Sequence, residues 1–374
     1  MEGIGMKKIY ICGLAASGKG LMKQLLDGHS KLCMMPFQGF VLKDMMAYDF
    51  NSLEFNLKLS SPYRKKYYKY MPSFNITNGD SPSKIYLDEF IRHIYYSYDL
   101  YIASRSNKIW GEAGEGVEAL IEFSFDYARF EEDWFDALFT REVNISIEEF
   151  LDIMYKCYFN NWKNKYIDTN NIQAMMTTVQ NGIEPIKWLY KNTKNSKLLL
   201  MERDEVGFSY ALANKKSRQE KKDLYVQLYN ISIINLLNSY RKFSYSEEMR
   251  NNPRVLIVDF NGLVLDTHNT MIKVADFLEI EYEDILTKAT LNRVHLESGG
   301  ISFTGKINDN PYESLSSDAI DFLRYLYRGP GENSTGMKKL YFKVKACKLM
   351  ALQKLNEWVQ RYERLMEVVK KRYQ

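Results

Sequence analysis

The chain has few of the residues that build metal centres and disulfide frameworks. Among 374 residues there are only four cysteines and four histidines. The cysteines are scattered and form no C-x-x-C pair, which argues against a zinc site and against a disulfide scaffold. We therefore expect no bound metal, and we expect a reducing compartment. The cysteines are Cys12, Cys33, Cys157 and Cys347.

Long hydrophobic runs are also missing. No stretch approaches the roughly 20 apolar residues that a membrane-spanning helix needs. Met1–Lys8 followed by Ile9–Ala16 superficially resembles a signal peptide. However, its apolar run is only about eight residues, a glycine interrupts it, and no small-residue cleavage site follows. These features predict a cytoplasmic protein.

Positive and negative charges nearly balance along the chain, except at its C-terminal end. The net charge is +4, yet residues 337–374 carry eight lysines and three arginines against three glutamates, a net +8. The rest of the chain is therefore at −4, and this balance excludes a globally basic nucleic-acid-binding protein.

The basic C-terminal segment, residues 337–372, has apolar residues near helical spacing and lysines on the opposite face, which predicts one long helix. Three roles remain open for it. It either docks on the body with a solvated basic face, or associates with a second copy, or contacts an anionic lipid or polysaccharide. Contact with lipid would place the protein at the inner membrane face. The apolar residues in this pattern are Leu340, Val344, Cys347, Leu355, Trp358, Tyr362, Leu365 and Val369.

Apolar runs that alternate with helical patterns predict the fold class. Lys7–Cys12 is a short β-branched and aromatic run, and a glycine-rich loop and a helical pattern follow it. This order favours an α/β fold, a three-layer sandwich with a central parallel sheet, whose ligand lies at the carboxyl ends of the strands. Further strands are predicted at Lys31–Pro36, Lys197–Met201 and Arg254–Phe260, and helices at Ile183–Tyr190, Asp223–Arg241 and Asn269–Leu278.

Irregular, aromatic-rich sequence separates the two parts of this pattern. We predict a nucleotide-binding core from residues 1–36 and 181–310, a mostly helical insertion at 37–180 on the acceptor side, and a helical extension at 311–374. The tyrosines of the insertion either stack on sugar rings or simply pack its interior.

The loop Gly13–Gly20 carries the clearest chemical signal. It matches the pattern G-x-x-x-x-G-K, in which small residues let backbone N–H groups converge on phosphate oxygens at a helix N-terminus. Lys19 is placed to neutralise charge on a transferred group. The ATPase pattern requires Ser or Thr at position 20, where the hydroxyl holds Mg²⁺, and this chain has Gly20. The loop therefore favours metal-independent chemistry on a phosphorylated ligand.

The segment Ile11–Leu32 resembles the 5′-phosphosulfate loop of sulfotransferases that use PAPS (3′-phosphoadenosine 5′-phosphosulfate), in particular the carbohydrate type. Ser17-Gly18 matches the Ser-Gly of that family, and Leu25–His29 matches the L-L-D-x-H that follows. Two departures stand in the loop itself. Ala16 replaces a basic residue and Lys19 replaces a threonine, so the resemblance implies that the catalytic cation has moved along the loop.

Three later segments resemble the same family in the same order. Leu198–Tyr210 is similar to its 3′-phosphate segment, which implies that Arg203 and Ser209 clamp a 3′-phosphate, although their spacing is about two residues short. Arg254–Leu278 is similar to a strand and helix of the family. Ser298–Ile307 resembles its late loop over the nucleotide, which implies contacts from Ser302, Gly305 and Lys306.

The resemblance implies transfer of a sulfuryl group from PAPS to a hydroxyl of a carbohydrate, glycolipid or other glycoconjugate, with PAP (adenosine 3′,5′-bisphosphate) as product. Lys19 and His29 are the catalytic candidates, and the base stays open between His29, His295 and the pair Glu112 and Glu115. A nucleotide kinase or other phosphotransferase, a non-catalytic nucleotide-binding module and a structural protein of the same fold are the alternatives. The expected nucleotide contacts are Ala16, Ser17, Gly18, Lys19, Gly20, Leu21, Arg203, Ser209, Ser302, Gly305 and Lys306.

Overall fold

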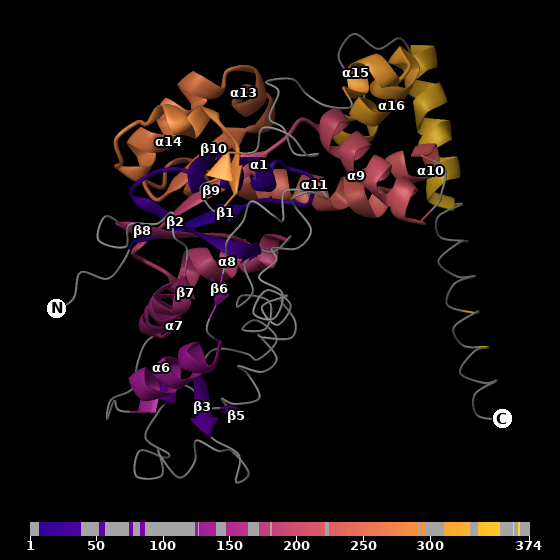
Figure 1. Ribbon diagram of the computed structural model, residues 1–374. Coiled ribbons are helices and arrows are strands. Elements are labelled where there is room, and N and C mark those ends of the chain that lie inside the picture. The colour runs from indigo at the N-terminus through magenta and orange to yellow at the C-terminus, as the bar shows by residue number, and fades with distance from the viewer. Residues whose placement is uncertain are drawn as a thin grey trace. The chain divides into compact units, whose positions relative to one another are not determined.

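The computed structural model (Figure 1) divides into two compact units. The first comprises Met1–Glu202 and Glu247–Lys306, and the second comprises Arg203–Ser246 and Ile307–Gln374. The structure describes residues 7–38, 52–56, 75–77, 83–86, 124–125, 127–139, 147–163, 172–179, 182–220, 224–291, 294–295, 310–329, 336–351, 362 and 366. Of the predicted site residues, Glu112, Glu115, Ser302, Gly305 and Lys306 lie outside these ranges.

A five-stranded sheet forms the centre of the first unit. Its strand order is β10-β9-β1-β8-β2, and each neighbouring pair is parallel. The carboxyl ends of all five strands therefore meet at one edge. This confirms the predicted α/β fold with a central parallel sheet. The strands are β1 (Lys7–Cys12), β2 (Leu32–Gln38), β8 (Ala174–Thr178), β9 (Ser196–Glu202) and β10 (Val255–Asp259).

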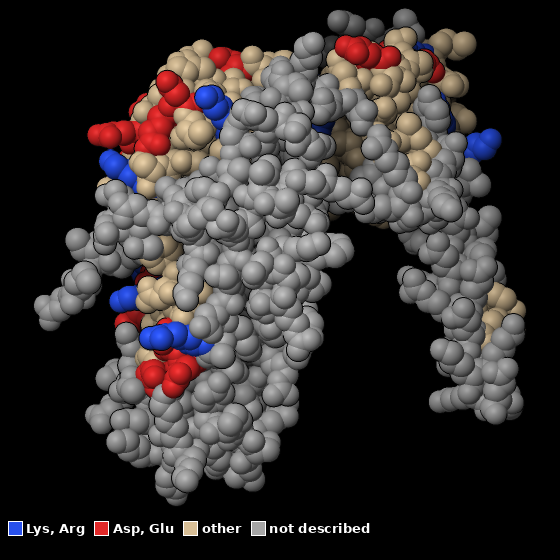
Figure 2. Space-filling model, in the orientation of Figure 1, with Lys and Arg blue, Asp and Glu red and all other residues tan. Residues whose placement is uncertain are grey.

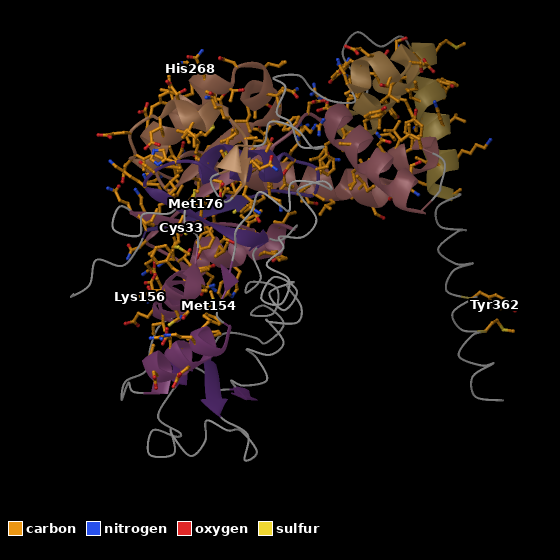
Figure 3. The ribbon with its side chains drawn as sticks, viewed as in Figure 1. Cys33, Met154, Lys156, Met176, His268 and Tyr362 are labelled. Atoms are coloured by element: carbon orange, nitrogen blue, oxygen red, sulfur yellow. The ribbon has the colours of Figure 1, made fainter. Side chains whose placement is uncertain are left out.

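Helices cover both faces of this sheet, as Figures 1 and 3 show. One face packs against α1 (Lys19–Asp27), α13 (Phe260–Leu265) and α14 (Thr267–Leu278) in a fully apolar cluster. The other face meets α7 (Ile147–Asn161) and α8 (Ile183–Asn192). The alternation of β1 explains both layers, because Ile9 and Ile11 join the α1 cluster while Tyr10 lies beside Tyr155 of α7, with ring centroids 6.5 Å apart.

The core sheet includes a strand that the sequence placed in the insertion. β8 lies between β1 and β2, with Ala174 in register with both Lys7 and Leu32. The boundary at residue 180 is therefore corrected, and the core resumes before β8. The remaining described elements of the first unit are β3 (Ser52–Asn56), β4 (Asn75–Thr77), β5 (Ser83–Tyr86), β6 (Ser124–Phe125), α6 (Tyr127–Phe139), β7 (Trp162–Lys163), α12 (Glu247–Arg250), the 3₁₀ helix η3 (Asp284–Thr287), β11 (Thr290–Leu291) and β12 (Val294–His295).

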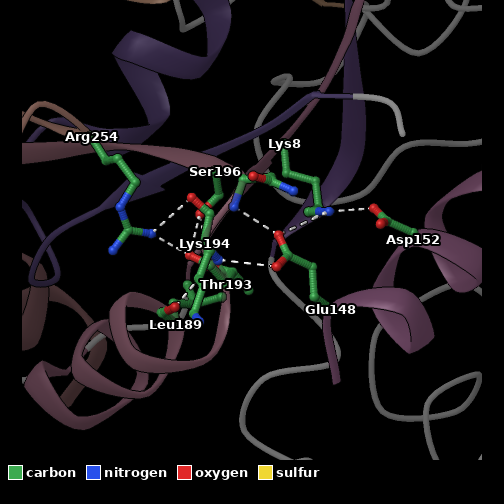
Figure 4. A network of polar contacts seen from close by, with 9 residues as sticks. Lys8, Glu148, Asp152, Leu189, Thr193, Lys194, Ser196 and Arg254 are labelled. Atoms are coloured by element: carbon green, nitrogen blue, oxygen red, sulfur yellow. Dashed lines mark hydrogen bonds and ion pairs between the residues drawn. The ribbon is translucent and has the colours of Figure 1, made fainter. Parts of the chain in front are cut away.

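A polar network holds the layers together at the amino ends of the strands (Figure 4). Lys8 on β1 pairs with Asp152 and Glu148 of α7. The Glu148 carboxylate also accepts hydrogen bonds from the backbone N–H groups of Lys194 and Asn195, at 3.2 and 2.8 Å. Because these contacts lie at the amino ends of the strands, they stabilise the scaffold and leave the carboxyl edge to other residues.

The second unit is helical in its described part. The single helix predicted over Asp223–Arg241 is two helices, because the Asn230 side chain accepts the Ser232 N–H at 3.0 Å and starts a new helix. An apolar cluster that includes Val206, Leu228 and Phe322 forms its core. Its helices are α9 (Glu205–Glu220), α10 (Leu224–Leu228), α11 (Ile231–Ser244), α15 (Pro311–Ser314), α16 (Ser317–Arg328) and residues 336–351.

The helix at residues 336–351 packs on its unit through Phe342, which lies outside the apolar stripe that the sequence predicted. Phe342 is buried in the apolar cluster, and Leu349 packs against it. Leu340 and Val344, which belong to the predicted apolar stripe, are 59% and 60% exposed. No described helix has the length and apolar character that a membrane span requires.

Candidate functional site

The loop between β1 and α1 contains two left-handed residues, a conformation that occurs in anion-binding nests. Ala16 (φ 64°) and Gly18 (φ 101°) are left-handed, and the intervening Ser17 donates its hydroxyl hydrogen to Leu14 O at 2.8 Å. Turns of this kind point successive backbone N–H groups into a shared concavity. Ala16 and Gly18 are only half buried, so the loop is accessible.

Gly18 is required by its surroundings as well as by its backbone angle. A Cβ atom built there would lie 3.0 Å from Cε2 of Phe260, and closer still to Cδ2. Phe260 is the first residue of α13, directly after β10. The aromatic ring of a distant segment thus rests against the loop, and this contact fixes the approach of α13 to the start of α1.

The start of α1 supplies hydrogen-bond donors. Gly18 is the N-cap and has no side chain to satisfy the first turn. By helix geometry, the N–H groups of residues 18–21 have no acceptor within the helix, and the positive end of the helix dipole lies here. These four residues are among the contacts predicted from the sequence. The Leu21 side chain packs against the core cluster, so its backbone N–H is the group available to a ligand.

Lys19 is buried, and its Nζ donates a hydrogen bond to Val179 O at 2.6 Å. Val179 directly follows β8, so the lysine links the loop to the neighbouring strand end. Its charge also acts on Cys12, the last residue of β1. Burial raises the pKa of the Cys12 thiol to about 12, and the Lys19 ammonium opposes that rise. The thiol is therefore protonated and is not a nucleophile at neutral pH.

The end of β8 contributes a group that sequence reasoning missed. Thr178 is 3% exposed, and its hydroxyl has no hydrogen-bond partner among the described residues. It is in register with Ile11, which lies on the face that α1 covers. The short apolar run at Ala174–Val179 was the available signal, but it lies inside the aromatic-rich insertion.

The second unit contains Arg203 and Ser209. Arg203 directly follows β9 along the chain and is 9% exposed. Burial lowers the pKa of its guanidinium, and the neighbouring Asp204 opposes this shift. The Asp204 carboxylate accepts the Gly207 N–H at 2.8 Å and the Tyr312 hydroxyl at 2.8 Å. Asp204 therefore fixes the first turn of α9 beside Arg203.

The Ser209 hydroxyl is bonded to the hydroxyl of Tyr327, at 2.6 Å. Burial raises the pKa of Tyr327 to about 12, so the phenol stays protonated at neutral pH. Two hydroxyl groups that share one hydrogen bond leave one hydrogen for a further acceptor. Tyr327 is thus a polar partner of the predicted site residue that the sequence gave no reason to single out.

Nearby in the second unit, Glu205 pairs with two arginines. Its carboxylate lies 2.9 Å from Arg241 and 2.6 Å from Arg328, and it is almost completely buried. The hydrogen bond from its backbone and the two guanidinium groups lower the pKa of Glu205 against the opposing effect of burial. The carboxylate therefore remains charged and holds α9, α11 and α16 together.

The structure places His29, a catalytic candidate of the sequence, among structural contacts. Its ring is fully buried, its Nδ1 accepts the Lys31 N–H at 3.1 Å, and its Nε2 lies 2.9 Å from Glu281 O. The Glu283 carboxylate also lies 3.4 Å from Nε2. His29 also follows the carboxyl end of α1, whereas the loop lies at the amino end. Nε2 therefore ties the residues around Glu281 to the end of α1, and Nδ1 fixes the turn that leads into β2.

The structure also describes the backbone or side chain of two other histidines. His268 on α14 is bonded to the Tyr282 hydroxyl at 2.8 Å, and Figure 3 shows its place in that layer. His295 lies in β12, which pairs antiparallel with β11. Within the described ranges, no three His, Cys, Asp or Glu side chains gather as metal ligands would.

Charged side chains do not concentrate on the described surface seen in Figure 2. Basic and acidic groups are interspersed on that face.

No family model matches the chain, and no curated protein matches it. Among solved structures it is similar to the sulfotransferase domain of an olefin synthase from Synechococcus PCC 7002, with 13% identity, 94% of this chain and 97% of that chain covered, and a TM-score of 0.39. It is also similar to the sulfotransferase domain from the curacin biosynthetic pathway, with 12% identity, 92% of this chain and 98% of that chain covered, and a TM-score of 0.39. The sulfotransferase STF9 from Mycobacterium avium is 10% identical, with 87% of this chain and 76% of that chain covered and a TM-score of 0.38. At these values the likeness assigns no activity to this chain.

Proposed function

We propose that this protein is a sulfotransferase that moves a sulfuryl group from PAPS to a hydroxyl of a carbohydrate or glycoconjugate. The observation that carries the proposal is the loop from β1 to α1. Two left-handed residues, an uncapped helix start and one buried lysine converge there. This donor set fits a phosphosulfate group, which is anionic and presents several acceptor oxygens.

Position 20 favours sulfuryl transfer over magnesium-dependent phosphoryl transfer. A Cβ atom at Gly20 would meet no atom within 4 Å, so crowding does not explain the glycine. The position has room for the serine or threonine that holds Mg²⁺ in ATPases, yet the chain lacks that hydroxyl. The sequence segments that resemble sulfotransferases, in family order, support the same choice.

In this proposal the chain holds the nucleotide and neutralises the charge that develops during transfer. PAPS supplies the sulfuryl group when it is bound. Backbone N–H groups of residues 18–21 hold the 5′ end, and Lys19 neutralises charge that develops on the leaving oxygens. Arg203 holds the 3′-phosphate with a charge-assisted contact, and Ser209 with Tyr327 supplies a hydroxyl donor. The proposal gives His29 no role with the acceptor proton, since both of its ring nitrogens contact backbone groups.

The role of Arg203 is tested by comparing two ligands that differ only in the 3′-phosphate. Calorimetric titrations of PAP and of adenosine 5′-monophosphate are made with the parent protein, Arg203→Ala and Lys242→Ala. Lys242 is an exposed cation on α11 and is the matched control. A charge-assisted contact of about 1.5–3 kcal/mol predicts that Arg203→Ala weakens PAP roughly 10–100-fold. The affinity for the monophosphate should change much less, and Lys242→Ala should change neither.

Equal losses of affinity for both ligands in Arg203→Ala would remove Arg203 from the 3′-phosphate site.

The lysine of the loop supports a second candidate function, because Lys19 stands where P-loop phosphotransferases have their phosphate-binding lysine. That function predicts ATP binding that requires Mg²⁺ and no preference for a 3′-phosphate.

A further inference from the structure

The helix at residues 336–351 has two apolar faces, and only one of them is covered. On the covered face, Phe342 is 2% exposed and packs 5.4 Å, centroid to centroid, from both Phe322 and Tyr325 of α16. On the other face an apolar stripe faces solvent. Its members follow one another at helical spacing and are Met337 (81% exposed), Leu340 (59%), Tyr341 (53%), Val344 (60%), Cys347 and Met350 (44%).

Lysines lie beside and within this exposed stripe. Residues 336–351 contain five lysines and no acidic residue. Two of the five are committed to the second unit, since Lys338 pairs with Asp321 at 2.7 Å and Lys345 lies 4.3 Å from the Phe322 ring centroid. The other three, Lys339, Lys343 and Lys348, have no ion-pair partner among the described residues. By helix geometry Lys339 and Lys343 lie along one edge of the stripe, and Lys348 lies within it, between Met337 and Tyr341.

We propose that this stripe and its three lysines, the 336–351 surface, bind the face of an anionic membrane. An exposed face that combines apolar side chains with lysines and has no acidic residue is the pattern of a helix that lies in the membrane interface, with its apolar side chains among the acyl chains and its lysines extended to the lipid phosphates. Further along the chain, Tyr362 and Met366 are also helical and exposed, and Figure 3 shows Tyr362.

Charge decides between a membrane and a second copy of the chain. Two copies paired through this surface would bring ten lysines together from residues 336–351 without one acidic side chain between them. Residues 337–374 as a whole carry a net charge of +8, so pairing with the following segment is also repulsive. An anionic lipid surface removes that repulsion, and each basic residue near it contributes about a fivefold gain in affinity.

Cys347 offers a direct probe, because it belongs to the stripe and the other three cysteines are buried. The full chain is labelled at Cys347 with a polarity-sensitive fluorophore and mixed with vesicles of phosphatidylcholine, with or without 30% phosphatidylglycerol. Phosphatidylglycerol vesicles should shift the emission to shorter wavelength and increase it, and pure phosphatidylcholine vesicles should not. Raising the salt concentration should weaken the response, because the lysines lie in water.

Two sets of variants separate charge from apolar contact. Changing Lys339, Lys343 and Lys348 to Gln should weaken vesicle binding about 100-fold, the product of three fivefold losses. Changing Lys187, Lys191 and Lys194 to Gln removes the same charge from exposed positions of the first unit and should change little. Val344→Asp should abolish the emission shift. Sedimentation of unlabelled protein with the vesicles checks that the fluorophore itself does not drive binding.

Three outcomes would overturn the proposal. One is equal binding to both kinds of vesicle. Another is no binding to either. The third is an emission shift that depends on protein concentration and not on lipid, which would show that the surface joins two copies. PAP affinity should be the same in all these variants, so a failure here leaves the proposed activity untouched, and failure of PAP binding leaves this surface untouched.

Discussion

Replacing Gly18 with alanine tests whether the loop geometry is as described. Gly18 has φ 101°, and its added Cβ would press on the Phe260 ring. A non-glycine residue in the left-handed region costs about 1–2 kcal/mol. Overpacking against an aromatic ring costs about 1–3 kcal/mol more. The free energy of unfolding should therefore fall by about 2–5 kcal/mol, a large part of the roughly 5–15 kcal/mol that a domain has.

Gly20→Ala is the matched control, two residues away on the same loop. Its Cβ meets nothing within 4 Å, and alanine in the first helical turn stabilises by about 0.5–1 kcal/mol. Urea unfolding followed by circular dichroism measures both variants. A double variant, Gly18→Ala with Phe260→Ala, should lose less stability than the sum of its single changes, because the steric conflict is gone. Equal stability of Gly18→Ala and Gly20→Ala would refute the described loop.

Three further predictions follow from other parts of the structure. Hydrogen bonds from Lys197 and, to a smaller extent, Lys7 lower the pKa of Glu279 to about 2. The stabilising effect of the Glu279 carboxylate should therefore be complete above about pH 4.5 and lost as the pH falls towards 2. Glu279→Gln should flatten the pH dependence of the urea midpoint over that range. A thiol reagent at pH 8 should modify one cysteine per native chain, Cys347, and more than one rapid reaction would contradict the burial of the others. Lys19→Ala should weaken PAP binding at least tenfold, whereas the exposed Lys191→Ala should not, and equal affinities would remove Lys19 from the site.

The first strand, loop and helix were predictable because their signals are local. The alternation of Lys7–Cys12 and the small residues after it depend on the backbone of that segment alone. The strand β10 and helix α14 were visible for the same reason. Here a short apolar run or a helical period stands out against polar neighbours.

The structure added features that depend on contacts between distant residues. β8 has only five residues, and its place between β1 and β2 is set by pairing with segments more than 130 positions away. His29 resembled a catalytic residue, yet its ring nitrogen meets Glu281 O, 252 positions along the chain. Ser209 and Tyr327 meet across 118 positions. Spacing along the sequence does not report such partners.

The C-terminal helix shows a third limit of sequence patterns. An apolar stripe at helical spacing usually marks the buried face of a helix. Residues 336–351 contain two such stripes, and the one that matched the pattern best, through Leu340 and Val344, is the exposed one. Aromatic packing around Phe342 decides which face is covered, and that depends on α16.

The central claim is tested most directly by the nucleotide preference of the unmodified protein. Calorimetric titrations compare PAP with ATP, each with and without Mg²⁺. A sulfotransferase should bind PAP with a dissociation constant in the micromolar range or below, about −8 kcal/mol or better, whether or not magnesium is present. ATP should bind more weakly, and magnesium should not rescue it. Tight binding of ATP that requires Mg²⁺, with no binding of PAP, would contradict the account and identify a phosphotransferase.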